Sequence, residues 1–370
     1  MEESKGKIGI REFIAILLLT IGPKYGDDTP AILFNLMGHA AWMSPIIIGV
    51  IAGIPLFFLY KVLSAYENKN LSDVINLLFG KAFGCIILFL LWLFGLGAIL
   101  FDTAIYTNII STMYFKKTPT IVIYAAMMVV CAYGAKKGLE QIGSVAWATL
   151  YWIKASLIAV LIIIFVQGIP SFLFPLFGPG EWKVLKESAS LTSLYSDLMF
   201  ITLIFSYIRN KRDYKKGTAI AMTIIITEHV FALIGYVMIF DYIGVKEINF
   251  PFHEAIRYIE LGFMVNVETF FFPLWVIASF IRFSIYLYLL AILFGAIFRI
   301  KEFEYVIPIL ATFIVFVGMI PENPTFTIFY LREKLLHLLT PVFIFFPIVL
   351  WVMAKIKGVF NNEKTDTSSG

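Results

Sequence analysis

Two basic side chains lie in the middle of long apolar segments. Lys154 is in the run over residues 145–167, and Arg282 is in the run over 265–298. If these segments cross a bilayer, each central charge costs roughly 2.5–3.5 kcal/mol on insertion scales, so it needs a partner or a function. A lysine removed from water can also gain and lose a proton near neutral pH. The two residues therefore predict buried ion pairs, a proton-coupling site, or both.

Five acidic residues are available as partners. They are Asp27, Asp28, Asp102, Asp197 and Glu228. From these we take Lys154, Arg282, Asp27 and Glu228 as candidates for proton or ion coupling, or for structural charge. The alternatives are static ion pairs that hold helices together and long side chains that reach out to water.

Two apolar segments are interrupted, and the interruptions bear on where a ligand would bind. Residues 21–30 contain two prolines, two glycines and three charges, which cannot continue a helix cheaply. Residues 191–197 form a softer break. Paired breaks at corresponding helices of two halves indicate an inverted-repeat transporter fold with a site at the midplane. The alternative is two ordinary kinks, or a long loop before the second segment.

The composition requires a membrane around these segments. Of the 370 residues, 60% are hydrophobic and 15% are charged, against about 45–50% and 25% in soluble domains. This excludes a soluble enzyme, a disordered protein and a secreted disulfide scaffold. A helix needs about 20 apolar residues to span a bilayer, and the runs are continuously apolar rather than alternating, so helices are expected instead of a barrel. Ten spans are predicted, near 11–37, 43–63, 84–111, 119–136, 145–167, 189–209, 217–240, 265–298, 304–320 and 335–356.

The basic residues predict the orientation. Of the 29 Lys and Arg, the loops on the side of the N-terminus hold 18 and those on the other side hold 8, including Arg332; Lys24, Lys154 and Arg282 lie in spans. This bias places both termini in the cytoplasm. We expect one all-α transmembrane domain over 1–360, with a first repeat over about 8–167, a second over about 189–357, and a disordered cytoplasmic tail over 361–370.

Other functions find little support. The sequence has no GxSxG, HExxH or Walker motif, so no enzyme is predicted. Cys85, Cys131 and the Glu228-His229 pair have no metal-ligand spacing, and we expect neither a metal nor another cofactor. The basic cluster Arg209–Lys216 is explained by membrane orientation, not by nucleic acid. The start of the chain imitates a signal peptide, but we interpret it as a retained first span.

The sequence also resembles the spore-germination permeases, which are the B subunits of Ger-type nutrient germinant receptors in the amino acid–polyamine–organocation superfamily. The resemblance covers roughly residues 8–357. It is carried by Ile8–Phe13, by Thr118-Pro119, by the most specific stretch Tyr133–Gly143, by Phe205–Lys211, and by the run Glu268, Trp275, Ser284 and Tyr288.

This resemblance implies a fold and a set of partners. The fold is two inverted five-helix repeats, LeuT/APC-like, with broken helices 1 and 6. The ligand is a small germinant, commonly an amino acid, sensed in the spore inner membrane. The partners are a multi-span A-type subunit and a C-type lipoprotein subunit. Lys154 looks like the lysine that replaces a sodium site in proton-coupled members of the superfamily.

A binding hypothesis combines both lines of reasoning. The carboxylate of an amino acid would meet the amides that follow Gly22 and Gly26, where the second half-helix begins. Its ammonium would meet carbonyls around Ser193–Tyr195. Side chains expected to select the ligand are Asp102, Asp197, Ser284 and Tyr288. The alternatives left open are a proton-coupled amino-acid transporter and a structural subunit with a vestigial pocket.

Overall fold

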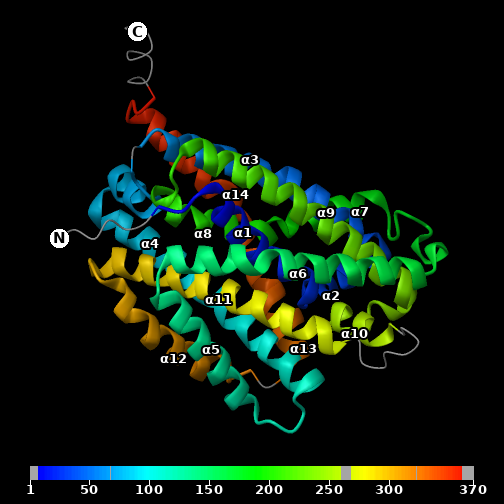
Figure 1. The fold of residues 1–370 in the computed structure, drawn as a ribbon. Coiled ribbons are helices and arrows are strands. Elements are labelled where there is room, and N and C mark those ends of the chain that lie inside the picture. The colour runs from blue at the N-terminus through cyan, green and yellow to red at the C-terminus, as the bar shows by residue number, and fades with distance from the viewer. Residues whose placement is uncertain (1–6, 67, 260–267, 322, 361–370) are drawn as a thin grey trace.

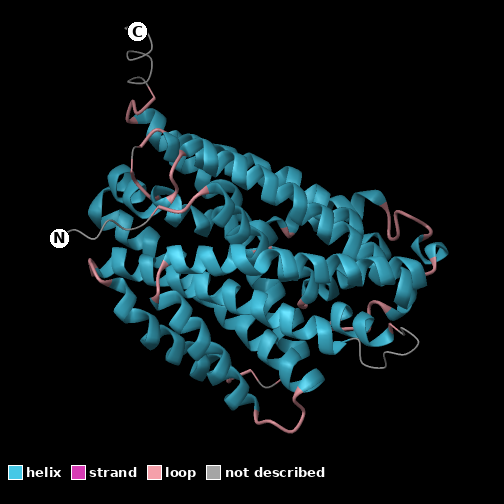
Figure 2. Cartoon of the chain, viewed as in Figure 1, coloured by secondary structure: helices cyan, strands magenta, loops and turns pink. Residues whose placement is uncertain are grey.

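The computed structural model describes residues 7–66, 68–259, 268–321 and 323–360, which form helices joined by loops (Figure 2). Within these ranges, the pairing outside helices is one parallel bridge between Ile8 and Ile208. The predicted tail 361–370 and residues 265–267 of the predicted eighth span lie outside the described residues.

Two helices lie at the centre of the bundle (Figure 1). Helix α1 (Ile10–Thr20) packs against α6 (Leu139–Gln167), α9 (Lys211–Gly244) and α11 (Glu268–Phe298). The most apolar part of α11 is 83% buried, whereas the corresponding parts of the other long helices are 28–50% buried. The outer helices therefore present much of their apolar surface outward, as lipid-facing helices do.

The remaining helices surround this centre. Their bounds are α2 Thr29–Met37, α3 Ser44–Ser64, α4 Leu71–Ile109, α5 Thr120–Lys136, α7 Glu181–Ser190, α8 Asp197–Ile201, α10 Pro251–Tyr258, α12 Ile307–Gly318, α13 Pro324–Phe326 and α14 Glu333–Ile356. Short 3₁₀ and π segments are η1 Gly22–Gly26, η2 Gly38–Met43, η3 Ile110–Tyr114, η4 Pro170–Leu173, η5 Thr192–Tyr195, η6 Thr202–Tyr207, η7 Phe303–Val306 and η8 Thr327–Arg332.

Six helical stretches in the described residues are long and apolar enough to cross a membrane, and a bent pair makes a seventh. α5 and the stretch Phe303–Gly318 are apolar but shorter. The half-helix α2 continues through η2 into α3 as one apolar stretch, Thr29–Ser64, so the first two predicted spans do not separate cleanly. The chain is thus an all-helical, multi-span protein. The count of ten spans and the two repeats stay predictions.

Both predicted helix breaks are present, the first of which was predicted from proline and glycine. α1 ends at Thr20, the 3₁₀ segment η1 follows, and α2 begins at Thr29 with Pro30 in its first turn. In the second break, Glu181–Ser190 and Thr192–Tyr207 meet at a bend of 50°. Both breaks interrupt backbone hydrogen bonding inside the bundle, where side chains must satisfy the freed groups.

Candidate functional site

Side chains from neighbouring helices satisfy the carbonyls that the first break exposes. Two of these side chains belong to α9 and one to α11. The three hydrogen bonds join Arg282 to the carbonyl of Thr20 at 2.9 Å, His229 to that of Gly22 at 3.1 Å, and Tyr236 to that of Tyr25 at 2.9 Å. Because a carbonyl only accepts, Nε2 of His229 carries the proton. His229 is therefore a buried residue that is hydrogen-bonded to the first break.

Helix α14 satisfies most of the second break. The hydroxyl of Thr340 donates to the carbonyl of Ser190 at 2.8 Å and accepts from the amide of Ser193 at 3.2 Å. The hydroxyl of Ser193 donates to the carbonyl of Leu336 at 2.6 Å. The side chain of Ser193 is thereby occupied by α14, and it is not free to select a ligand in this conformation.

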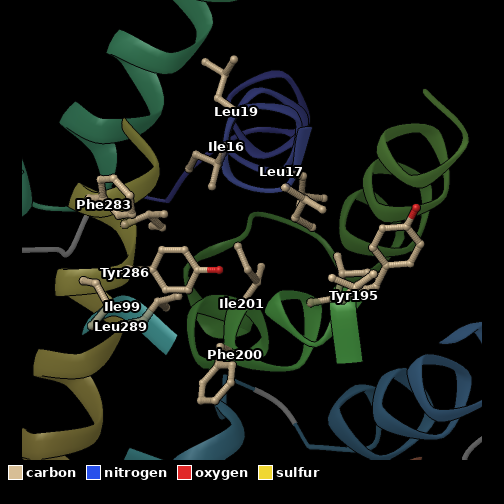
Figure 3. Packing of buried hydrophobic residues seen from close by; sticks show 14 of the residues in the cluster. Ile16, Leu17, Leu19, Ile99, Tyr195, Phe200, Ile201, Phe283, Tyr286 and Leu289 are labelled. Atoms are coloured by element: carbon tan, nitrogen blue, oxygen red, sulfur yellow. The ribbon is translucent and has the colours of Figure 1, made fainter. Parts of the chain in front are cut away.

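Lys24 joins the two breaks to each other. Its ammonium donates to the carbonyl of Leu194 at 2.5 Å and pairs with the carboxylate of Asp197. The same carboxylate accepts a hydrogen bond from the hydroxyl of Tyr286. In Figure 3 this hydroxyl points from α11 toward the side of Ile201. One side chain from the first break therefore occupies the carbonyl and the carboxylate that the second break presents.

Two buried arginines hold the remaining carboxylates. Arg282 pairs with Asp102 at 2.5 Å. Arg332, just before α14, reaches Asp27 and Asp102 at 3.1 Å each and also pairs with Asp28. These contacts connect the first break to α4, α11 and the start of α14.

These side chains form one buried group of charges, which we call the break cluster. None of its members is more than 6% exposed. Its members are Lys24, Arg282, Arg332, Asp27, Asp28, Asp102 and Asp197. Four carboxylates face three basic groups, so the cluster carries a formal charge of −1. A buried charge without a partner is strongly unfavourable, and in this cluster each carboxylate contacts at least one base.

Lys154 and Glu228 form a separate pair beside the first break. Their ammonium and carboxylate are 2.6 Å apart, with the side chains 16% and 14% exposed. A Cβ placed on Gly22 would lie 3.1 Å from the Lys154 ammonium and 3.5 Å from the Glu228 carboxylate. The pair between α6 and α9 thus packs on the backbone of Gly22, where any larger residue would displace it.

A small cavity lies where the breaks meet. Its lining includes Lys24, Thr29, Ser44, Ile48, Tyr195 and Leu233. The space open to the centre of a water molecule is about 20 Å³, enough for about one water. Thr29 is 5% exposed. In the described part of the chain no three His, Cys, Asp or Glu side chains are grouped to hold a metal. The cavity has a mostly apolar wall with a few polar groups, among them Lys24, Thr29 and Ser44.

The structure brings most of the predicted site residues together. Gly22 and Gly26 lie in the first break, Asp102 and Asp197 are in the break cluster, and Tyr195 lines the cavity. At Gly26 a Cβ would lie 2.9 Å from Trp275 and 3.2 Å from Phe252, so this position admits only glycine without a shift. That the predicted site residues bind a ligand stays a prediction.

Ser284 and Tyr288 are not part of this site. The hydroxyl of Ser284 donates to the carbonyl of Cys131 in α5 at 3.1 Å, and the ring of Tyr288 packs against Phe303. The family resemblance pointed to α11, which does contribute to the site, but Ser284 and Tyr288 lie on the face of this helix that is turned away from the break cluster.

Sequence reasoning missed two members of the break cluster. The placement of Arg332 in a loop on the outer side is wrong, because it is 4% exposed and binds three carboxylates. Lys24 was counted in a span but given no role. The adjacent acids Asp27 and Asp28 were the available signal, since two buried carboxylates in a break require more than one nearby base.

Comparison with known proteins agrees with this architecture. The sequence model of the family described as "Spore germination protein" matches residues 29–327. The chain is 25% identical over 315 residues to Spore germination protein KB of Bacillus subtilis (strain 168), covering 80% of each chain.

Solved transporters share the fold. MhsT in complex with L-phenylalanine superposes with a TM-score of 0.61 at 16% identity, over 93% of this chain and 88% of that one. Mhp1, a nucleobase-cation-symport-1 family transporter in a closed conformation with bromovinylhydantoin, gives a TM-score of 0.59 at 15% identity, over 92% and 78%. With a family model matching most of its length, the chain belongs to the spore germination protein family of membrane proteins built on a transporter fold.

Proposed function

We propose that this chain is the membrane subunit of a spore nutrient-germinant receptor and that it binds a small germinant, an amino acid, in the cavity between the two helix breaks. The observation that carries the proposal is a buried cavity between the two breaks that contains both the Thr29 hydroxyl and the Lys24 ammonium. Family membership and the name of the Bacillus subtilis relative support the connection to germination.

The cavity groups suit a zwitterion. Thr29 is the first residue of α2, and its hydroxyl can donate to a ligand carboxylate, whereas its amide donates to Asp27 at 2.7 Å. The Leu194 carbonyl and the Asp197 carboxylate are acceptors for an ammonium. Ile48 and Leu233 supply an apolar wall. MhsT, which shares the fold, was solved with L-phenylalanine, and an amino acid is the ligand class that fits these groups here.

Binding must change the conformation, because the cavity holds about one water. A ligand that enlarges it moves the break segments, and it shifts the protein toward the state that it binds more tightly. In this proposal the ten-span chain lies in the spore inner membrane with both termini cytoplasmic. The change passes to a multi-span A-type subunit and a C-type lipoprotein subunit.

A matched pair of tryptophan substitutions in α3 tests the cavity. Ile48 is 1% exposed and lines it, whereas Val50 is 71% exposed on the same helix. Spores carrying Ile48→Trp should require at least tenfold more amino-acid germinant than wild type, and spores carrying Val50→Trp should respond normally. Equal dose responses of the two variants, at equal amounts of assembled protein, contradict the proposed site.

The second candidate function is proton-coupled amino-acid transport, which the Lys154–Glu228 pair beside Gly22 favours. The pair packs on the backbone of the first break, so a movement of the break would change its environment. Proteoliposomes that contain only this chain would accumulate labelled amino acid under an imposed proton gradient if it transports. A receptor subunit would bind the amino acid without net uptake.

A further inference from the structure

We propose that Lys24 is a tethered substitute for the ligand's ammonium: it occupies the ammonium site of the cavity, and a ligand must carry a free primary ammonium to displace it. This inference rests on the proposed function and specifies its chemistry. It predicts that Lys24 competes with the ligand. Without a ligand, the side chain of Lys24 joins the two breaks.

The geometry of the site is that of a primary ammonium site. The Lys24 ammonium, on a side chain that is 5% exposed, has two acceptors from the second break. They are the Leu194 carbonyl, at 2.5 Å, and the Asp197 carboxylate. A carbonyl freed by a helix break together with a carboxylate supplies the acceptors that a group with three N–H donors needs. The tip of Lys24 fills this position, so a second ammonium cannot enter beside it.

The cavity volume supports displacement rather than addition. The open space holds about one water, and Lys24, Tyr195 and Leu194 line it. A ligand larger than water therefore has to move a side chain. Lys24 is the lining residue whose departure frees both space and acceptors, and its four-carbon stem is flexible.

Charge balance selects an ammonium over an anion as the displacing group. The break cluster already has four carboxylates and three bases. A ligand that brought only a carboxylate to Lys24 would leave five anionic groups with three bases in a buried region, which is unfavourable. When an amino acid displaces Lys24, its ammonium takes the place of Lys24 at Asp197, and the released Lys24 ammonium can pair with the carboxylate of the ligand, so the formal charge of the cluster is unchanged.

The test is chemical rescue of Lys24→Ala with n-propylammonium chloride, which replaces the side-chain atoms that the substitution removes. The full-length chain is purified in detergent, and its melting temperature is followed against amine concentration, with 1-propanol and tetramethylammonium chloride as controls. We expect n-propylammonium to raise the Tm of Lys24→Ala saturably by several degrees, because a ligand of the folded state stabilises it. Neither control compound should do so.

Two further proteins show whether the acceptors and the competition are as proposed. Lys24→Ala/Asp197→Asn should lose the amine effect, because its carboxylate is gone. Wild type should need at least tenfold more amine than Lys24→Ala for half of the effect, because the tethered ammonium competes. Absence of amine-specific stabilisation, its persistence in the double variant, or equal midpoints for wild type and Lys24→Ala each overturn the proposal.

The test stays decisive if Lys24→Ala is recovered unfolded. The amine added during extraction should then restore a monodisperse protein while 1-propanol does not, and failure of this rescue counts against the proposal. The outcome is separable from that of the proposed function. If the tether proposal fails while Ile48→Trp still impairs the germinant response, the cavity stands as the site and Lys24 is a fixed structural charge.

Discussion

Opposite faces of α11 carry polar side chains with different partners. Arg282 and Tyr286 lie four residues apart on the face toward the break cluster, where they bind Asp102 and Asp197. Ser284 and Tyr288 have the same spacing but are offset by two residues, which is about 200° around a helix.

Among the described residues, the second face of α11 has no contact with the break cluster, and the one carboxylate near Tyr288 is the half-buried Glu304. Ser284 bonds a backbone carbonyl, and Tyr288 packs on a ring. The comparison teaches that a polar residue in an apolar helix is not by itself a site residue, because only one face of α11 contacts buried charge. Removing a side chain should therefore cost much more stability on the first face than on the second.

Arg282→Met should have the largest effect. It leaves the Thr20 carbonyl without its donor and Asp102 with Arg332 alone, so we expect a loss of about 3–5 kcal/mol in unfolding free energy. Unfolding in mixed micelles with a rising fraction of dodecyl sulfate measures it. Adding Asp102→Asn should recover part of the loss, and a loss below about 1 kcal/mol would contradict the role of this face.

Tyr286→Phe should have the next largest effect. It removes a hydroxyl that donates to a buried carboxylate, a bond worth about 1.5–3 kcal/mol. Tyr288→Phe is the matched control, because the ring of Tyr288 packs against Phe303 and the substitution keeps the ring. Its unfolding free energy should differ from that of wild type by less than about 0.5 kcal/mol. Equal losses measured by the same unfolding assay would remove the distinction between the two faces.

The Lys154–Glu228 pair lies outside the break cluster, so it tests whether a charged pair elsewhere contributes as much stability. A double-mutant cycle with Lys154→Met and Glu228→Gln should give a coupling energy of about 1 kcal/mol, because both groups are partly accessible and screened. The losses in unfolding free energy caused by Lys154→Met and by Tyr286→Phe should be additive within about 0.5 kcal/mol. Strong coupling between the latter two would mean that the pair and the break cluster act as one network.

Ser284→Ala should lower the unfolding free energy by only about 0.5–1 kcal/mol, since it removes one neutral hydrogen bond to the Cys131 carbonyl. The germinant dose response of spores carrying it should be unchanged, because Ser284 lies outside the cavity. A shifted dose response at normal stability would return Ser284 to the binding site.

Local features of the chain were predictable from sequence. Pro23, Pro30, Gly22 and Gly26 fall within ten residues, and this composition alone requires the first break. The acids chosen as possible partners for Lys154 and Arg282 included Glu228 and Asp102, the ones they pair with. Buried bases in apolar spans therefore predict ion pairs well.

Pairings between distant residues were not predictable. Arg332 contacts Asp27 across 305 positions, and a base just before an apolar run is as typical of a loop as of a buried site. Lys24 finds its acceptors only because the two breaks meet in space. Ser284 and Tyr288 came from resemblance to a family, which locates a helix but not which of its faces is turned toward the site.

The most direct test of the central claim is protection of a cysteine in the cavity. In a Cys85→Ser/Cys131→Ala background, Thr29→Cys places a thiol in the cavity lining, and Thr112→Cys places one at an exposed position outside it. The rate of modification by methyl methanethiosulfonate is measured with each amino acid that triggers germination of spores carrying the chain. We predict at least fivefold slower modification of Thr29→Cys and an unchanged rate at Thr112→Cys. Unchanged rates at both positions with every such amino acid would contradict a ligand site between the helix breaks.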